Sequence, residues 1–346
     1  MAWISRGTLR STLLGLAAFT ALRAVVRRAR ALDWGGRVVI ITGGTRGLGL
    51  LIAEEVGKRG ARIAICGRDQ GAVAEAERRF AHLGGNVLVH RADLGEREQA
   101  EGFVERVVST WGRVDVLVNC AGVIQVAPLE STPVERLEET MRSNFWSAAY
   151  TIYAALPYLR RQRGARIVNI SSTGGRVAVP HLLAYSASKF ALQGLSEGLF
   201  AELRHAGVGV TTVLPAPMRT GSIYNAEFLG NTRDEFAWFG LSASLPLISV
   251  DARRAARAVV RAAENGEVEI EIGLGSHALS LLHGVAPRVT QRLMALAARA
   301  LPAPGDASGH AQRGRDVGSP LVDSGLLHLS NTAAIRNNES PPATVH

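Results

Sequence analysis

Short runs of apolar, β-branched residues alternate along the chain with longer segments whose apolar residues recur at helical spacing. The runs show no alternation of polar and apolar positions, which is typical of strands buried on both faces. The clearest runs lie at residues 37–41, 61–66, 86–90, 114–118 and 167–171. The helical segments lie at residues 70–83, 96–111, 133–163, 184–206 and 251–265. This alternation predicts an α/β fold with a doubly wound parallel sheet and right-handed crossovers.

A glycine-rich turn follows the first of these strands directly. Its sequence is Thr42-Gly43-Gly44-Thr45-Arg46-Gly47-Leu48-Gly49, and a helix opens within it. Strand, glycine-rich turn and helix form the first unit of a Rossmann-type fold, in which exposed N–H groups at the start of the helix meet the pyrophosphate of a dinucleotide. Gly43 allows the tight turn, Gly47 lets the backbone approach the pyrophosphate, and Gly49 lets the helix pack on the sheet. The turn therefore predicts a dinucleotide site.

A second motif, Tyr185-Ser-Ala-Ser-Lys189, lies in the predicted helix 184–206. The chain has 39 lysines and arginines, of which only Lys58 and Lys189 are lysines, so we expect Lys189 to supply something that arginine cannot. Residues i and i+4 share one face of a helix, which sets the Lys189 ammonium beside the Tyr185 phenol. We expect this cation to favour the phenolate and to pull the pKa of Tyr185 below its ordinary value of about 10, towards the range of a general acid/base.

Together these motifs resemble the short-chain dehydrogenase/reductase family, and the likeness runs over residues 35–275. Asn119-Cys-Ala-Gly122 looks like the family's Asn-Asn-Ala-Gly, with cysteine in place of the second asparagine. Asn144 matches the family's helix asparagine. Ser172 lies thirteen residues before the tyrosine, the family's usual interval, and is therefore preferred to Ser171. The resemblance implies the catalytic set Ser172, Tyr185, Lys189 and Asn144.

The resemblance also implies which residues hold the cofactor. Asp93 matches the aspartate that meets the adenine ring, and Thr220 stands in the place of the threonine near the cofactor amide. One departure is Ala216, which follows Pro215 where the family usually has glycine, so the geometry of this loop is open. The expected cofactor-binding residues are Gly43, Thr45, Arg46, Gly47, Leu48, Gly49, Arg68, Asp93, Leu94, Asn119, Ala121, Gly122, Tyr185, Lys189, Pro215 and Thr220.

The end of the second strand indicates which nicotinamide cofactor is used. An NAD-selective site needs a carboxylate about twenty residues beyond the glycine turn, whereas an NADP site needs arginine for the 2′-phosphate. Gly67 stands where that carboxylate would be, and Arg68 follows it. Arg46, within the glycine turn, could reach the same phosphate, so NADP(H) is predicted. The alternative is that Arg68 and Asp69 form a solvated surface pair.

Composition limits the remaining possibilities. At 346 residues with 47% apolar content, the chain can bury one substantial core, which indicates a single catalytic domain at 35–275 with extensions at both ends. Cys66 and Cys120 end strands that should flank the first strand on opposite sides, so we expect free thiols and a cytoplasmic, reducing compartment. No Cys/His cluster has metal-ligand spacing, so no metal is expected.

The net charge of +9 lies largely in the extensions and comes with no base-stacking or groove-reading motif, so we expect no nucleic-acid partner. In residues 1–34, the apolar run 13–22 is too short for a confident membrane span. Arg23, Arg27 and Arg30 follow it on one helical face. Two interpretations stay open: a helix that anchors the protein peripherally to the cytoplasmic face of a membrane, and a helix that covers an interface of a homodimer or homotetramer.

The C-terminal extension has two predicted parts. Residues 276–301 form an amphipathic helical segment in which Pro287 is well placed as a first helical residue, with Arg288, Arg292 and Arg299 on one stripe. This segment either covers the mouth of the active site, contacts a membrane, or packs on its own domain. Residues 302–346 are rich in proline, glycine, serine and asparagine and show little periodicity, so we expect a mostly disordered tail.

The expected function is an NADP(H)-dependent oxidoreductase that interconverts an alcohol and a ketone or aldehyde, with Tyr185 as the general acid/base. Residues 217–250, which close over the substrate in the resembling family, contain five aromatic residues and favour a bulky apolar substrate. His181 is a further candidate for the pocket. Two alternatives remain: a catalytically weak membrane-associated NADPH-binding or scaffold protein, and an epimerase or dehydratase of longer relatives that share the Tyr-Lys motif.

Overall fold

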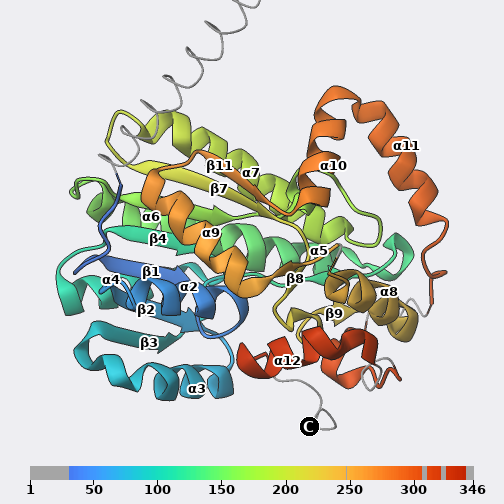
Figure 1. Cartoon of the computed structure of the whole chain (residues 1–346), viewed down its shortest axis with the longest axis horizontal. Coiled ribbons are helices and arrows are strands. Elements are labelled where there is room, and N and C mark those ends of the chain that lie inside the picture. The colour runs from blue at the N-terminus through green and yellow to red at the C-terminus, as the bar shows by residue number, and fades with distance from the viewer. Residues whose placement is uncertain (1–30, 247, 306–309, 321–324, 340–346) are drawn as a thin grey trace, which may run out of the picture.

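The structure is a computed structural model that describes residues 31–246, 248–305, 310–320 and 325–339. Its centre is a seven-stranded sheet in the order β11-β7-β6-β4-β1-β2-β3, with every neighbouring pair parallel (Figure 1). These strands are β1 (Val38–Thr42), β2 (Arg62–Gly67), β3 (Val87–Arg91), β4 (Val116–Asn119), β6 (Arg166–Ile170), β7 (Gly209–Pro215) and β11 (Glu269–Ile272). The order reverses beside β1, which confirms the predicted doubly wound α/β fold of the Rossmann type.

Helices cover both faces of the sheet (Figure 1). One face packs against α2 (Gly47–Gly57), α3 (Gln70–Phe80) and α9 (Ala252–Asn265). The other packs against α4 (Arg97–Trp111), α6 (Ser147–Leu159) and α7 (Leu183–Leu203). Side chains of a strand point alternately to its two faces, so Val39 and Ile41 join the first core cluster while Val38 and Ile40 join the second. Both faces need apolar residues, which is why the strands read as unbroken apolar runs.

The predicted helix 133–163 is interrupted in the structure. It begins as α5 (Val134–Met141), passes through a π-helical turn at Arg142–Trp146 and continues as α6. A π-helical turn inserts one extra residue into a helix, is rare, and occurs frequently at functional sites. The candidate catalytic Asn144 lies in this turn and is fully buried.

Smaller elements lie beyond the carboxyl ends of the central strands (Figure 1). One three-stranded sheet has the order β12-β9-β5 and one two-stranded sheet pairs β10 with β8. The strands are β5 (Gln125–Val126), β8 (Met218–Arg219), β9 (Glu227–Phe228), β10 (Val250–Asp251) and β12 (Gln312–Arg313), and the helix beside them is α8 (Thr232–Ser244). Residues at the carboxyl ends of parallel strands form the binding crevice in folds of this kind, so these elements border the expected site.

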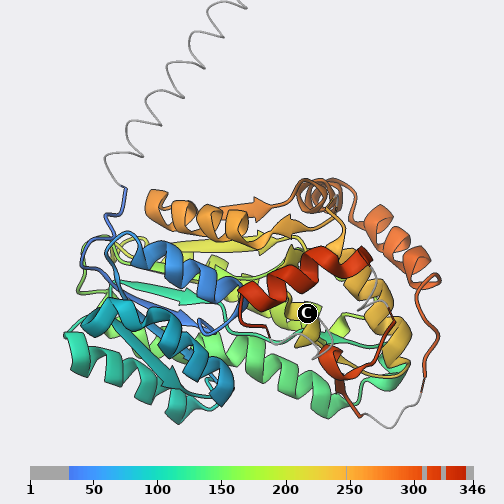
Figure 2. The same cartoon turned by 60° about the horizontal axis from the view of Figure 1, so that its bottom comes forward.

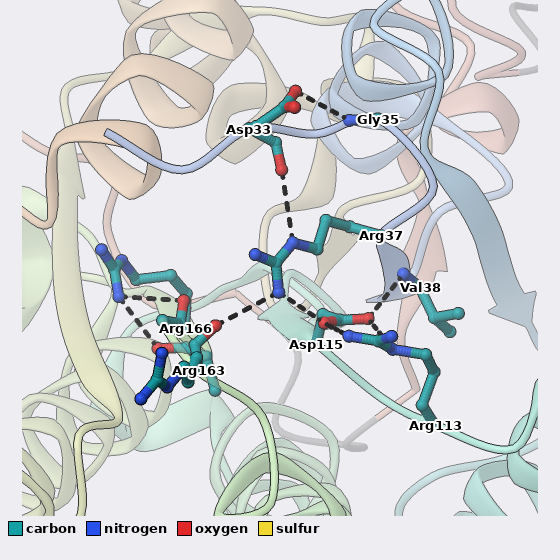
Figure 3. A network of polar contacts seen from close by, with 10 residues as sticks. Asp33, Gly35, Arg37, Val38, Arg113, Asp115, Arg163 and Arg166 are labelled. Carbon is teal, nitrogen blue, oxygen red and sulfur yellow. Dashed lines mark hydrogen bonds and ion pairs between the residues drawn. The ribbon is translucent and has the colours of Figure 1, made fainter. Parts of the chain in front are cut away.

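The opposite end of the sheet is held by a charged network around Asp115 (Figure 3). Its carboxylate is buried and accepts hydrogen bonds from the guanidinium groups of Arg37 and Arg113, at 2.8 Å each, and from the Val38 N–H at 3.0 Å. Burial alone would raise the pKa of Asp115, but the hydrogen bonds from Arg113, Val38 and Arg37 hold it below its ordinary value. The network ties the starts of β1 and β4 together, far from the crevice.

The C-terminal region is more ordered than its composition predicts. Most of residues 276–301 lie in two helices, α10 (Leu274–Val285) and α11 (Pro287–Ala298), which project from the body (Figure 1), and Pro287 is the first residue of α11 as predicted. The tail is not mostly disordered in its described parts, 310–320 and 325–339, because β12 pairs with β9 and α12 (His328–Arg336) packs on the domain. Its buried residues are small, which hid the helix from a periodicity argument: Ser330, Ala333 and Ala334.

The predicted N-terminal helix falls in residues 1–30, which lie outside the described residues. Leu32 and Trp34, just after it, are buried in the first core cluster. Within the described ranges, the structure contains no helix that is both long enough and apolar enough to cross a membrane. Cys66 and Cys120 are both free thiols, as predicted from their places on opposite sides of β1.

Candidate cofactor and active site

The glycine-rich turn between β1 and α2 has a backbone that only glycine accommodates well. Gly43 and Gly47 have φ of 65° and 58°, in the left-handed region that L side chains rarely adopt. A Cβ on Gly43 would lie 2.8 Å from the Cα of Ala121, and one on Gly49 would lie 2.4 Å from the carbonyl oxygen of Gly43. The turn thus packs directly on the loop after β4 and leaves the first N–H groups of α2 facing the crevice.

A cleft of about 470 Å³ runs along this turn across the carboxyl ends of the strands. Most of the predicted cofactor residues line it: Gly43, Thr45, Arg46, Gly47, Leu48, Gly49, Arg68, Asp93, Leu94, Ala121, Gly122, Tyr185, Lys189, Pro215 and Thr220. The turn, the ends of β2, β6 and β7, and the loops after β3 and β4 all contribute, so residues far apart in the sequence meet in one cleft. Its shape and its row of backbone N–H groups fit a dinucleotide.

Asn119 is the predicted cofactor residue whose side chain points elsewhere. Its Nδ2 donates a hydrogen bond to Oδ1 of Asn169 at 2.8 Å, and Asn169 in turn donates to Ser196 at 3.0 Å. These residues belong to β4, β6 and α7, so the network ties the sheet to the helix that carries Tyr185. Within the described residues, Oδ1 of Asn119 is buried without a hydrogen-bond partner. The side chain of Asn119 therefore links the sheet to α7 in this structure and does not face the cleft.

Tyr185 and Lys189 line the cleft, and Ser172 lies beside Tyr185. A Cβ on Gly174 would lie 3.3 Å from the Tyr185 ring and 3.4 Å from the Ser172 hydroxyl oxygen, so both side chains border the same glycine. The Lys189 ammonium lies 5.8 Å from the Tyr185 ring centroid and donates a hydrogen bond to the Ile170 carbonyl at 2.9 Å. Ser171 also lines the cleft, but its hydroxyl is engaged, because it donates to the Lys189 carbonyl. Ser172 is the serine that forms a hydrogen bond with Tyr185.

The pKa expected for Tyr185 is wrong in direction for the protein without its cofactor. Burial raises the pKa of the Tyr185 phenol, and a hydrogen bond from Ser172 offsets this only in part. Lys189 is itself buried, which lowers the pKa of its ammonium to about 8. The expected lowering rested on the charge of Lys189 alone. Desolvation of the phenol has the larger effect on the pKa of Tyr185. Burial also raises the pKa of the nearby Cys120 thiol to about 12, so that group is neutral.

Asn144 lies beside this group without contacting the phenol. Its Oδ1 accepts the Val123 N–H at 2.7 Å, and its Nδ2 donates to the Val123 carbonyl at 3.0 Å and to the Ser188 hydroxyl at 2.9 Å. A Cβ on Gly122 would lie 2.9 Å from Oδ1 of Asn144 and 3.6 Å from Nζ of Lys189. The asparagine and the lysine therefore approach the same glycine from two helices, and both are buried.

The two arginines proposed to bind a 2′-phosphate both line the cleft, and each contacts another side chain of the protein. Arg68 lies 3.5 Å from Asp93 and is half exposed. Arg46 donates to Asn225 at 3.1 Å. Asp69 is not a partner of Arg68: it caps α3 by accepting the Ala72 N–H at 2.8 Å. A Cβ on Gly67 would lie 2.3 Å from the Thr45 hydroxyl oxygen, so position 67 has no room for a carboxylate side chain.

The loop with Ala216 keeps an ordered geometry despite the departure from the family pattern. The Ala216 N–H donates to the Ile272 carbonyl at 2.8 Å, and its side chain is buried. A Cβ on Gly273 would lie 2.7 Å from that of Ala216, so glycine at 273 makes room for alanine at 216. Thr220 follows, with its hydroxyl accepting the Ser222 N–H at 3.0 Å.

The aromatic residues expected to form a substrate lid pack mainly on one another. Tyr224, Phe228 and Phe236 are fully buried in a third core cluster, which also contains Phe239, with Trp238 and Tyr185 at its border. Besides the predicted cofactor residues, the cleft is lined by a mixed set that includes Val123, Ile124, Ser143, Ser147, Met218, Ser222, Glu227 and Arg313. The apolar character predicted from composition thus belongs largely to the core beneath the site.

His181 is held by a buried acid. Its Nδ1 lies 2.7 Å from Glu235, whose other oxygen accepts the Trp238 indole N–H at 2.7 Å. Burial raises the pKa of Glu235, although the hydrogen bonds from Trp238 and His181 oppose this. His181 has φ of 59°, an uncommon conformation for a residue other than glycine, so the pair fixes a strained turn four residues before Tyr185.

Sequence reasoning missed three residues that complete the cleft. Glu339 and Arg313, from the C-terminal tail, line it, and Asn225 links Glu339 to Arg46. Nothing in the local pattern of residues 302–346 signals these contacts, because they depend on where the chain returns after α11.

Comparisons with known proteins agree with this geometry. The family model for short chain dehydrogenase matches residues 37–227. The chain is 35% identical over 241 residues to 11-beta-hydroxysteroid dehydrogenase A from Sesamum indicum, covering 68% of each chain. A solved short-chain dehydrogenase from Streptomyces avermitilis superposes with a TM-score of 0.65 at 28% identity, over 77% of this chain and 99% of that one.

A second solved relative, a short chain dehydrogenase from Burkholderia cenocepacia J2315 in complex with NADP, superposes with a TM-score of 0.62 at 26% identity, over 76% of this chain and 99% of that one. The family match covers more than half of the chain and includes the glycine-rich turn, Tyr185 and Lys189. The chain belongs to the short-chain dehydrogenase/reductase family of oxidoreductases.

Proposed function

We propose that this protein is an NADP(H)-dependent oxidoreductase that interconverts an alcohol and a ketone or aldehyde. The observation that carries the proposal is that Tyr185, with Ser172 hydrogen-bonded to it, and Lys189 line the same cleft as the glycine-rich turn. A nucleophile, a metal cluster or a carboxylate pair would indicate other chemistry; this set instead provides one hydroxyl donor, one phenol and one ammonium. Such groups suit proton transfer at an oxygen atom.

The side chains have separate tasks in this proposal. The nicotinamide supplies or accepts the hydride when it is bound. In reduction, Ser172 donates a hydrogen bond to the substrate oxygen and Tyr185 donates the proton to it. Lys189 stabilises the phenolate that Tyr185 becomes and holds the nicotinamide ribose. Asn144 fixes the backbone at Val123 and, by the family resemblance, holds a water that relays protons to Lys189.

The raised pKa of Tyr185 is compatible with this role. A buried phenol that stays protonated is ready to act as the acid in carbonyl reduction. The opposite direction, alcohol oxidation, needs the phenolate, which the ammonium of Lys189 favours only when that lysine is charged. The pKa of Lys189, lowered to about 8, lets the lysine exchange protons near neutral pH.

Three observations support NADP(H) over NAD(H). Arg46 and Arg68 line the adenosine end of the cleft, where guanidinium groups can bind a 2′-phosphate. Position 67 has no room for the carboxylate that would bind a ribose 2′-hydroxyl. The Burkholderia relative was solved in complex with NADP. The cofactor would be held by the turn 43–49, by Arg68, Asp93 and Leu94, and by Gly122, Lys189 and Thr220.

For the substrate we propose a bulky, largely apolar alcohol or ketone. Ile124, Val123 and Met218 line the cleft, and Ile124 and Tyr185 pack against the third core cluster. A relative named for 11-beta-hydroxysteroids is similar over 68% of the chain. Glu227 and Arg313 also line the cleft, so we expect the substrate to carry a polar group besides the reacting oxygen.

We also propose that the enzyme is a homo-oligomer, a dimer or tetramer, and that it contacts a membrane peripherally. Large apolar side chains are exposed on α6 and α7, including Tyr153 and Phe190, as expected for a surface that pairs with a second copy. On α10 and α11, Leu274, Val285 and Leu296 are exposed beside Arg288 and Arg292, a combination that suits anionic lipid headgroups.

The function is tested by following NADPH oxidation over a panel of hydrophobic ketones and aldehydes, with NADH in parallel. We expect turnover on at least one member and a preference for NADPH. Tight NADPH binding without turnover on any member would favour the alternative, a binding or scaffold protein. Elimination or epimerisation of a sugar nucleotide, with no net change in NADPH, would favour the remaining alternative, an epimerase or dehydratase.

A further inference from the structure

The end of the described chain lies across the glycine-rich turn. The Gly47 N–H, the first of α2, donates a hydrogen bond to the Asn337 carbonyl at 2.9 Å. The Asn338 side chain donates to the Thr45 carbonyl at 2.8 Å and to the Ala72 carbonyl at 3.1 Å. The segment 337–339 therefore uses backbone groups of the turn that a dinucleotide needs.

Glu339 brings a negative charge to the same place. Its carboxylate lines the cleft, has only 5% of its side chain exposed, and lies so close to the turn that a Cβ on Gly47 would be 2.4 Å from Oε1. Oε2 accepts a hydrogen bond from Asn225 at 2.6 Å and lies 3.8 Å from Nε of Arg46. A carboxylate at the start of a helix, beside an arginine, occupies the kind of site that phosphate takes.

This docking is built into the fold and reaches well beyond the last residues. Gly221 has φ of 92°, and a Cβ there would lie 2.3 Å from the Cα of Ala334 in α12, so the domain surface is shaped for the helix. The Tyr224 hydroxyl donates a hydrogen bond to Asn331, and the Asn337 side chain donates to the Thr220 carbonyl at 3.0 Å. Figure 2 shows one end of α12, in red, next to one end of α2, in blue.

Burial of the docked Glu339 carboxylate is energetically unfavourable. Burial raises the pKa of Glu339, and the attraction of Arg46, the hydrogen bond from Asn225 and the charge of Arg315 offset this only in part. A pyrophosphate brings more charge and more acceptor oxygens to the same N–H groups than one carboxylate does. The two anions would also repel each other in a site shielded from water.

We propose that residues 337–339 are an internal competitor of the cofactor: they occupy the start of α2 and engage Arg46, and a dinucleotide binds by displacing them. The proposal rests on the proposed function in one respect, that the cleft binds NADPH. Displacement frees the Gly47 N–H and Arg46 together, and the observed affinity for NADPH is reduced by the fraction of molecules whose segment is docked. By linkage, NADPH must release the segment as much as the segment weakens NADPH.

The test uses the full chain in three forms: wild type, Glu339→Gln, and Glu202→Gln as a matched control on the exposed end of α7. Titration calorimetry gives the affinity for NADPH, and amide hydrogen exchange of residues 328–339 gives the state of the segment with and without NADPH. We expect Glu339→Gln to bind NADPH about three- to tenfold more tightly, because the anion at the helix start is gone, and the control to match wild type. NADPH should accelerate exchange in residues 328–339 of the wild type.

Two results would overturn the proposal. If Glu339→Gln binds NADPH as weakly as wild type or more weakly, the carboxylate does not compete. If NADPH slows exchange in residues 328–339, the segment is a strap that closes over bound cofactor. Failure of every form to bind NADPH would overturn the proposed function itself, and the competition with it, and is distinguished by the calorimetry of wild type alone.

Discussion

The ammonium group of Lys189 donates a hydrogen bond to the carbonyl oxygen of Ile170 over 2.9 Å, at the point where β6 ends beneath α7. Among the described residues, it is the one hydrogen bond that the buried Lys189 ammonium makes, and burial lowers the pKa of the lysine to about 8. Lys189 is therefore poised to take a further partner, and its charge destabilises the fold when no ligand is bound.

Replacing Lys189 with methionine should change how stability depends on pH. Because the folded-state pKa lies below the unfolded value, the unfolded chain binds more protons between about pH 8 and pH 10.5, and the free energy of unfolding of the wild type should rise across that window by up to about 3 kcal/mol. Lys189→Met should lack this rise. Urea unfolding at pH 7 and pH 10.5 measures it, with Lys58→Met, at an exposed lysine, as the control. Equal pH dependence in wild type and Lys189→Met would contradict the depressed pKa.

Replacing Arg68 with aspartate should exchange the cofactor preference. The change removes a guanidinium from the adenosine end of the cleft and adds a carboxylate that repels a 2′-phosphate and accepts from a ribose hydroxyl. We expect the ratio of kcat/KM for NADPH to that for NADH to fall by about a hundredfold, with hydride transfer itself preserved. Arg62→Asp, at the other end of β2, makes the same charge change away from the cleft and should leave the ratio alone. An unchanged ratio in Arg68→Asp would remove Arg68 from the cofactor site.

Replacing Asp115 with asparagine should destabilise the fold without altering the cleft. The change removes the negative charge and turns one of the two acceptor oxygens that meet the guanidinium groups into an NH2 donor, and we expect a loss of about 2 to 4 kcal/mol at neutral pH. The folded-state pKa of Asp115 lies below its ordinary value, so this contribution is present above about pH 3.8 and is lost as the pH falls through the folded-state pKa. Urea unfolding between pH 3 and pH 7 would show the difference from wild type shrinking only in acid. Asp33→Asn, at the exposed edge of the same network, is the control. A similar loss of unfolding free energy in Asp33→Asn would mean that the buried Asp115 carboxylate contributes no more to stability than an exposed one.

The sequence predicted those parts of the molecule that depend on local pattern. The glycine-rich turn, the apolar strands and the Tyr185-Lys189 spacing each encode their structure within a few residues, and the turn, Tyr185 and Lys189 line one cleft at the carboxyl ends of the parallel strands. The start of α11 at Pro287 is a similar case, because the fixed φ of proline suits the first helical residue.

What the sequence could not predict depends on contacts between distant segments. The pKa of Tyr185 is set by how fully the surrounding chain excludes water, which no spacing reveals. The aromatic residues of 217–250 look like a lid in sequence, but Leu327 from the tail completes their cluster and turns them into core. Likewise Glu339 reaches the glycine-rich turn only because α12 fits against Gly221. In each case a residue distant in the sequence, or the sum of many residues, decides the outcome.

The central claim, that Tyr185 is the proton donor and acceptor of an NADPH-dependent oxidoreductase, is tested most directly by Tyr185→Phe, which keeps the ring and removes the hydroxyl. Stopped-flow absorbance of NADPH oxidation on the best ketone of the panel, together with NADPH affinity by calorimetry, gives both quantities on one sample; Tyr153→Phe, at an exposed tyrosine, is the control. The account predicts that turnover falls by at least about a thousandfold while NADPH affinity changes by less than about threefold. Turnover within about tenfold of wild type would contradict it.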